Sequence, residues 1–114
     1  MTPDDLVALI ERHRYTITCE RELQEAVGLV LTRAGVSFSS EVRLSARDRP
    51  DFMIGPVAIE AKVQGYRGAV LTQVWRYLEH PQVESLVLVT TLRRHNLPSE
   101  LRGKPIRVAL ARGL

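Results

Sequence analysis

The sequence has little cysteine, little lysine and no long apolar run. The missing cysteines and apolar runs exclude a disulfide-stabilised protein and a membrane-spanning protein. Its 114 residues contain one cysteine, Cys19, so no disulfide can form within the chain and a reducing, intracellular compartment is expected. No run approaches the roughly 18 apolar residues of a membrane span. The N-terminus carries Asp4 and Asp5 where a signal peptide would be basic. We therefore expect a cytoplasmic protein that does not associate with a membrane.

Motifs of several well-known chemistries are also missing. The chain has no Cys/His spacing of a zinc site, no phosphate-binding glycine loop and no nucleophile elbow around a serine. It has no internal repeat and no low-complexity segment. Hydrophobic residues make up 45% of the chain and charged residues 25%, which is ordinary for a globular protein. The length favours a single domain spanning residues 1–114.

Most of the basic residues are arginines. The formal net charge of +3 mildly favours a polyanionic partner but decides nothing alone. Only two of the 16 basic residues are lysines, Lys62 and Lys104. Arginine suits bidentate contacts with phosphate, although a general bias towards arginine codons explains the same pattern.

The most informative stretch is a pair of short apolar strands on either side of Gly55-Pro56, a strong turn signal. The second strand, residues 57–63, alternates apolar and polar residues. If the turn is a two-residue hairpin with glycine at positive φ, the pairing follows by counting. That register places Asp51 opposite Glu60 on one face of the hairpin.

Two opposed carboxylates destabilise a hairpin unless a cation lies between them, because their Cβ atoms are only about 4.5–5.5 Å apart. Mg²⁺ takes oxygen ligands and is usually held by one or two carboxylates together with water and substrate phosphate. Lys62 follows Glu60 by two residues and shares its face, where an ammonium can hold water or neutralise charge on a phosphate. The spacing predicts a divalent-metal site. The alternative is a pair of solvated charges on an exposed strand.

The sequence Pro50-Asp51, followed by Glu60-Ala61-Lys62, resembles the PD-(D/E)xK nuclease superfamily. The resemblance includes the proline, both acids, the one-residue spacer and the lysine. It implies that Asp51 and Glu60 are catalytic residues that bind Mg²⁺ or Mn²⁺. It also implies that Lys62 is catalytic and assists the attacking water.

The same resemblance implies a fold and a function. The expected fold is α/β with a restriction-endonuclease-like αβββαβ core over about residues 19–90, in which helices flank a mixed central sheet. An extra N-terminal helix and a C-terminal strand would be additions.

The expected function is that of a metal-dependent deoxyribonuclease, an endonuclease of DNA repair, replication or recombination. Its expected partner is DNA, and a homodimer is the candidate assembly. Small archaeal Holliday-junction resolvases and virus-type replication–repair nucleases are similar. The alternative is a non-catalytic nucleic-acid-binding or assembly protein on the same fold.

The rest of the chain fits this order of elements. We expect helices at residues 3 to 14 or 15, 19–34 and 69–79, and strands at 36–44, 51–54, 57–63, 83–90 and 106–111. The run 83–90 is almost continuously apolar, which predicts a central strand buried on both faces. The helix between them makes this strand parallel to residues 57–63, and the last strand is expected at the sheet edge.

The helix expected at residues 19–34 carries three acidic side chains near its start. Helical phase places Glu20 on or beside the apolar stripe, whereas Glu22 and Glu25 point away. Nucleases of the superfamily often carry a glutamate on the first core helix that approaches the metal. The resemblance therefore makes Glu20 a third catalytic and metal-binding candidate, with Gln24 beside it as a substrate-binding candidate. The alternative is that Glu20 only stabilises the helix N-terminus.

Gln73 and Tyr77 are four residues apart on the next expected helix and so share one face. Gln-x-x-x-Tyr after a Glu-x-Lys strand resembles a motif of the RecB-like and lambda-exonuclease-like branch of the superfamily. The resemblance implies that both residues help to place substrate or nearby active-site groups.

Basic residues follow both of the strands expected to be parallel. Arg67 lies in the loop after Lys62, and Arg93 and Arg94 lie in the loop after the central strand. Parallel strands bring these loops to one edge of the sheet, where open α/β sheets usually bind ligands. All three arginines are therefore substrate-binding candidates. His95, in the same basic loop, is expected at the surface, with phosphate contact or base catalysis as the alternative.

Overall fold

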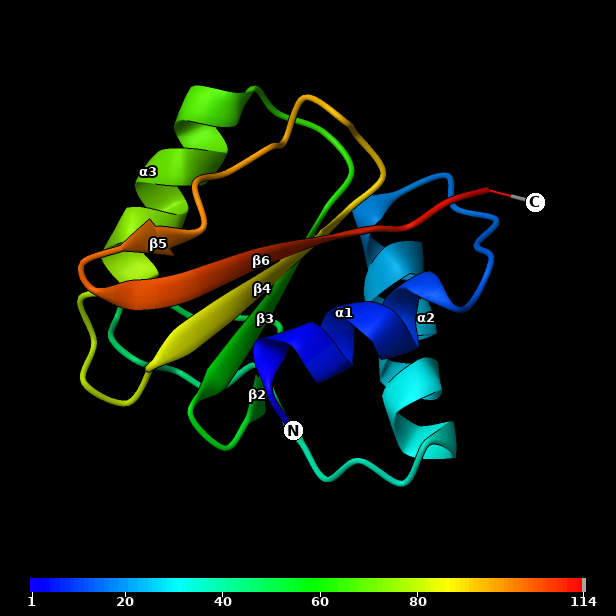
Figure 1. The fold of residues 1–114 in the computed structure, drawn as a ribbon, viewed down its shortest axis with the longest axis horizontal. Helices are drawn as coiled ribbons and strands as arrows, with labels where there is room; N and C mark the ends of the chain where they lie inside the picture. Colours follow the sequence, from blue (N-terminus) through cyan, green and yellow to red (C-terminus); the bar gives the residue numbers. More distant parts are fainter. Residues whose placement is uncertain (114) are drawn as a thin grey trace.

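A mixed six-stranded sheet forms the middle of the protein, in a computed structural model that describes residues 1–113 (Figure 1). Its strands are β1 (Ser39–Ser40), β2 (Phe52–Ile54), β3 (Val57–Lys62), β4 (Ser85–Thr90), β5 (Glu100–Leu101) and β6 (Lys104–Leu110). The spatial order is β1-β2-β3-β4-β6-β5. β3, β4 and β6 run parallel, and the outer pairs are antiparallel. The expected α/β class with a mixed sheet is confirmed.

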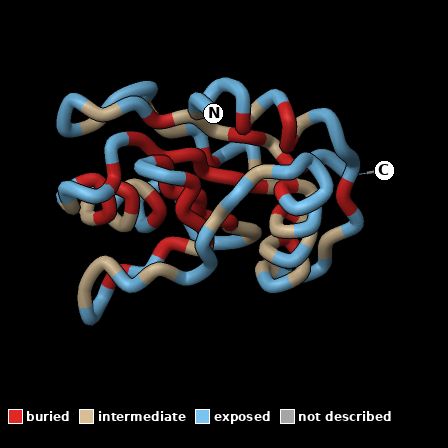
Figure 2. The backbone as a smooth tube through the Cα atoms, turned by 90° about the horizontal axis from the view of Figure 1, so that it is seen from below, coloured by how far each residue is buried: buried red, intermediate tan, exposed pale blue. Residues whose placement is uncertain are grey.

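Three helices cover the two faces of this sheet: α1 (Pro3–Glu11), α2 (Glu20–Arg33) and α3 (Arg67–Tyr77). α1 and α2 lie on one face and α3 on the other (Figure 1). Figure 2 shows the buried positions gathered along the middle of the molecule, with exposed turns around them. The elements from α2 to β4 follow the expected order, with α1 before them and β6 after them. No helix within residues 1–113 is long and apolar enough to cross a membrane.

The hairpin between β2 and β3 has the register predicted by counting. Gly55 adopts a φ of 56°, as a two-residue turn with glycine first requires. The paired residues are Ile54 with Val57, Met53 with Ala58 and Phe52 with Ile59. Asp51 and Glu60 come next along the two chains, so the hairpin brings them to the same end.

β4 is the central strand that its composition predicts. All six of its residues are buried, and it pairs in parallel with both β3 and β6. A strand with helices over both faces buries both sets of side chains, which explains the absence of polar alternation in Ser85–Thr90.

The strand expected at residues 36–44 is wrong in extent, because only Ser39 and Ser40 pair with β2. Glu41 has a φ of 49°, which breaks the strand alternation. The apolar residues before and after the break consequently pack on opposite faces of the sheet. Val36 and Phe38 join the core under α1 and α2, whereas Val42 and Leu44 join the core under α3.

Other boundaries differ from expectation: α3 spans Arg67–Tyr77 instead of residues 69–79, and β6 begins at Lys104 instead of residue 106. α1 ends at Glu11, earlier than residue 14 or 15. β6 is not a simple edge strand, because β5 pairs with its first two residues through a tight turn at Arg102 and Gly103. Both turn residues have positive φ, 55° and 72°. The guanidinium of Arg102 lies 3.8 Å from the ring centre of Trp75 on α3, a contact that holds this turn against the helix.

Candidate active site

Asp51 and Glu60 lie together at the end of the β2–β3 hairpin. The backbone N–H of Asp51 donates a hydrogen bond to Oε1 of Glu60 over 3.3 Å. Glu60 retains only 4% of its accessible surface, although it lies on a strand face that also carries Lys62. The Glu-x-Lys segment is therefore not a pair of freely solvated charges.

Two hydrogen bonds fix the carboxylate of Asp51. Its Oδ1 accepts from Nε2 of Gln24 on α2, and its Oδ2 accepts from the backbone N–H of Ala61, each over 2.8 Å. The first bond crosses from the helix layer to the sheet, so Gln24 orients Asp51. A contact between Gln24 and substrate stays a prediction.

The environment of both acids disfavours their charged forms. Burial, with a smaller contribution from the charge of Glu20, raises the pKa of Asp51 to about 6. Burial and the nearby Asp51 carboxylate raise the pKa of Glu60 to about 8. Nζ of Lys62 lies 3.5 Å from Oε2 of Glu60, and its charge lowers both pKa values without offsetting the burial. Without a cation the pair therefore favours holding a proton at neutral pH, and a bound cation would favour the ionised form of both acids.

The donor set fits a divalent cation that is only partly held by protein. Among residues 1–113, no three His, Cys, Asp or Glu side chains are grouped so that they could hold one ion together. Mg²⁺ is commonly bound by one or two carboxylates, with water and substrate oxygens completing its shell. Asp51 and Glu60 are the carboxylates that would hold it, because each has lone pairs left beyond its hydrogen bonds.

Glu20 is the acid on α2 that acts on Asp51. Its charge contributes to the raised pKa of Asp51. Glu22 instead accepts hydrogen bonds from the backbone and hydroxyl of Thr18, both over 2.7 Å, and Glu25 faces an exposed arginine one turn away. Glu20 does not complete a three-residue ligand group with Asp51 and Glu60. Its part in metal binding or catalysis stays a prediction.

Tyr77 faces the carboxylates from α3. Its side chain is buried, and its hydroxyl oxygen accepts a hydrogen bond from Nε2 of Gln73 over 3.2 Å. Burial, followed by the charges of Glu60, Asp51 and Asp48, raises the pKa of Tyr77. The phenol is therefore neutral at physiological pH, and Gln73 and Tyr77 form the shared helix face that their spacing predicts.

Asp48 is a buried acid that the sequence does not single out. It retains 4% of its accessible surface. Its Oδ1 accepts from Nε of Arg76 over 2.9 Å, and its Oδ2 is bonded to Nε2 of His80 over 2.8 Å. Burial alone would raise the pKa of Asp48, but the hydrogen bonds from His80 and Arg76 outweigh it and lower the pKa. The only sequence signal is the four-residue spacing of Arg76 and His80.

The loops after β3 and β4 meet at one edge of the sheet, as parallel strands require. Arg67, predicted in the loop, is the first residue of α3, and its Nε donates to the carbonyl of Asn96 over 2.6 Å. Nε of Arg94 donates to the carbonyl of Gly65 over 3.3 Å. Arg93 is exposed in the same loop. Contacts of these arginines with substrate stay predictions.

The expected surface position of His95 is wrong. The residue has no accessible surface, and its ring joins the two loops. Nδ1 lies 2.7 Å from Oγ1 of Thr90 at the end of β4, and Nε2 lies 2.7 Å from the carbonyl oxygen of Gly65. A carbonyl can only accept, so Nε2 carries the hydrogen. His95 therefore has no free nitrogen for a phosphate or a reacting group.

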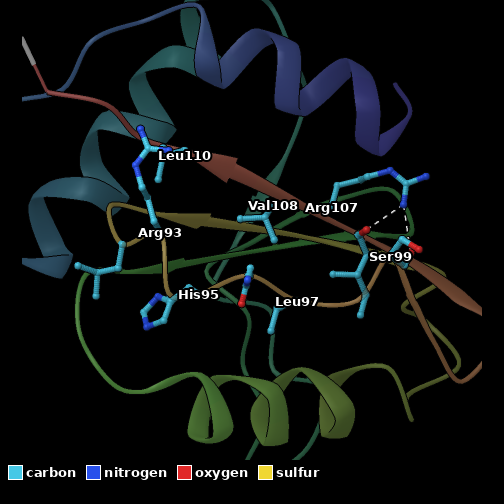
Figure 3. Close-up of a pocket in the computed structure, with 10 residues that line it drawn as sticks. Arg93, His95, Leu97, Ser99, Arg107, Val108 and Leu110 are labelled. Atoms are coloured by element: carbon cyan, nitrogen blue, oxygen red, sulfur yellow. Dashed lines mark hydrogen bonds between the residues drawn. The ribbon is translucent and has the colours of Figure 1, made fainter.

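Three hollows bear on the site. One of about 270 Å³ is lined by Lys62, Gln64, Gly65, Ala69, Val70, Gln73 and Arg76. Another, of about 290 Å³, includes Gln24, Glu41 and Asp51. A third, of about 400 Å³, lies between β6 and the loop after β4, and Figure 3 shows it with Arg107 bonded to the Ser99 carbonyl. Its lining is mainly apolar and includes none of Asp51, Glu60 and Lys62, whereas the first hollow includes Lys62 and the second includes Asp51.

No protein-family model, curated protein or solved structure matches this chain. The functional argument therefore depends on the residues of the site itself.

Proposed function

We propose that the protein is a metal-dependent nuclease that hydrolyses phosphodiester bonds in DNA. One observation carries the proposal: Asp51 and Glu60 lie together at the end of the β2–β3 hairpin, where burial raises the pKa of both acids, and Lys62 lies 3.5 Å from Glu60. Buried acids of like charge are costly in a purely structural role, and strongly perturbed pKa values cluster at functional sites.

The order of elements supports a restriction-endonuclease-like core as the finer description of the fold. α2, β1, β2, β3, α3 and β4 follow one another in the αβββαβ order, with the acids at the β2–β3 hairpin. Membership of the PD-(D/E)xK superfamily is part of this proposal.

Each residue has a distinct part in the proposed reaction. A Mg²⁺ or Mn²⁺ ion, when bound, would activate water and stabilise charge on the phosphate. Asp51 and Glu60 would hold it, and Gln24 and the Ala61 amide keep Asp51 in place. The ammonium of Lys62 orients the attacking water or stabilises charge on a phosphate oxygen.

A cleavage panel tests the proposal. Labelled single-stranded, duplex, flap and four-way DNA, with matched RNA, are incubated with Mg²⁺, Mn²⁺ or EDTA. The variants are Glu60→Gln and, as a control, Glu84→Gln, which alters an exposed glutamate just before β4. We expect the wild type and Glu84→Gln to cleave DNA with metal, and Glu60→Gln to lose cleavage.

Two results would refute the proposal. A folded wild type that binds nucleic acid but cleaves no substrate with either metal would refute the nuclease and favour the non-catalytic binding protein. Cleavage that persists in EDTA would refute the metal requirement.

A further inference from the structure

The hollow of about 270 Å³ beside Lys62 adjoins the proposed reaction site, but the proposed hydrolysis assigns no ligand to it. It lies between the end of β3 and the face of α3. Lys62 and Arg76 are cationic members of its lining, and Gln73 adds an amide. No acid is among its lining residues, and Glu60 and Asp48, which pair with these two cations, retain only 4% of their surface each. The hollow is therefore suited to an anion with several oxygens.

Arg76 is oriented for such an anion. Its Nε is bonded to Asp48, which fixes the plane of the guanidinium. Within residues 1–113, neither of its terminal nitrogens makes a hydrogen bond, and 27% of the side-chain surface is accessible. Arginine held in this way presents a planar pair of donors, the geometry that matches phosphate oxygens.

We propose that this hollow is a phosphate-binding subsite built from Arg76, Lys62 and Gln73, with Asp48 as the positioning residue that aims Arg76. It rests on the proposed function, since the subsite would take a phosphate of the nucleic acid next to the one that is cleaved. A terminal phosphate and a backbone phosphate share the required chemistry.

Asp48 couples the subsite to the acids. It bonds the last turn of α3 through Arg76 and the following turn through His80. Its own carbonyl accepts from the amide of Leu44, which closes the loop that leads into Asp51. Asp48→Asn keeps an acceptor that can orient Arg76, so it should change phosphate binding less than the loss of Arg76 does.

The test is an NMR titration of the full chain with inorganic phosphate in EDTA, where neither metal nor cleavage contributes. We expect phosphate to shift the amides of residues 62–76. Arg76→Gln should raise Kd about tenfold or more, as expected for the loss of a charge-assisted bidentate contact. Arg107→Gln is the matched control, because Arg107 is also held through Nε, 2.8 Å from Asp4, but lies on β6. Arg76→Lys keeps the charge without the planar donors and should fall between them.

Two oligonucleotides distinguish the sources of phosphate. Short single-stranded DNA is titrated in EDTA with a 5′-phosphate or a 5′-hydroxyl. A loss confined to the phosphorylated strand in Arg76→Gln assigns a terminal phosphate to the subsite, and an equal loss with both strands assigns a backbone phosphate.

The subsite is overturned if folded Arg76→Gln and Arg76→Lys bind phosphate and both strands with the Kd of Arg107→Gln. It is also overturned if phosphate shifts only the amides around Arg93 and Arg94. Because these measurements use no metal and no cleavage, they fail independently of the nuclease proposal, which the Glu60→Gln cleavage assay decides.

Discussion

β3 and β4 are parallel neighbours with similar burial but opposite chemistry. Glu60 pairs in register with Leu88, and Lys62 with Thr90. Glu60 and Leu88 retain 4% and 0% of their surface, yet one is an acid and the other a leucine. Burial of an acid beside a second acid costs stability, whereas burial of leucine provides it. The contrast indicates that β4 contributes to the stability of the fold, whereas the end of β3 is where we propose that the chemistry takes place.

The largest effect expected from this contrast is on cleavage. Lys62→Ala should lower the rate by roughly 10²–10³-fold or more, as for removal of one preorganised charge that acts on the transition state. Lys62 has no part in either apolar core, so the melting temperature should change little. Rate and melting are measured on the same preparation. A folded variant that cleaves at the wild-type rate contradicts the assignment of chemistry to this end of β3.

Leu88→Ala should have the converse effect. A fully buried leucine replaced by alanine lowers the free energy of unfolding by about 2–5 kcal/mol. Urea unfolding measures this loss, and the cleavage rate per folded molecule should be unchanged at a temperature where the variant is native. A loss below about 1 kcal/mol would show that β4 is less important to the core than its burial suggests.

The pH dependence of stability should also distinguish the acids at the end of β3 from the apolar residues of β4. Asp51 and Glu60 have folded-state pKa values of about 6 and about 8, above their unfolded values, so the folded protein binds more protons. The metal-free protein should therefore gain stability as pH falls from about 8 towards 5, with a rise in melting temperature of roughly 5 °C or more.

The control for that measurement is a pair of glutamates. Glu60→Gln removes the titrating acid next to Asp51 and should flatten the curve, whereas Glu84→Gln, at an exposed position before β4, should leave it unchanged. Thermal melts in EDTA between pH 5 and 8 give the answer. A wild type that loses stability steadily as pH falls across this range would contradict the raised pKa values.

The smallest expected effect is on DNA binding by the loop that follows β4. Arg93 and Arg94 follow β4 at the edge that the acids share. If each contacts a phosphate, Arg93→Ala with Arg94→Ala should weaken DNA binding across sequences and reduce the salt slope by roughly one unit per lost contact. Binding is measured at several salt concentrations. An unchanged slope would show that Arg93 and Arg94 do not contact the phosphates, so that the proposed DNA-binding surface would not include the loop after β4.

Local signals made the hairpin predictable from sequence. The Gly55-Pro56 turn has few conformations, and one turn geometry fixes every pair that follows it. The parallel pairing of β3 with β4 followed from the helix between them. Both predictions concern elements that follow one another in the chain.

Features that depend on distant partners were not predictable. Asp48 meets Arg76 and His80 from 28 and 32 residues away, and no local pattern marks it. His95 looked like a loop residue because its partners Thr90 and Gly65 belong to two different strand ends. The early end of β1 depends on the positive φ of Glu41, a conformation that its residue type does not demand.

The imidazole of His95 has a mechanical consequence for the rim of the sheet. Since it is bonded to the Gly65 carbonyl and to the Thr90 hydroxyl, the loops after β3 and β4 cannot separate without breaking it. Thr90 Oγ1 in turn accepts from the amide of Leu92. Local opening at this rim should thus be one cooperative event, in which amides of both loops exchange with solvent deuterium at a common rate. The loops after β3 and β4 are therefore expected to open together rather than one at a time.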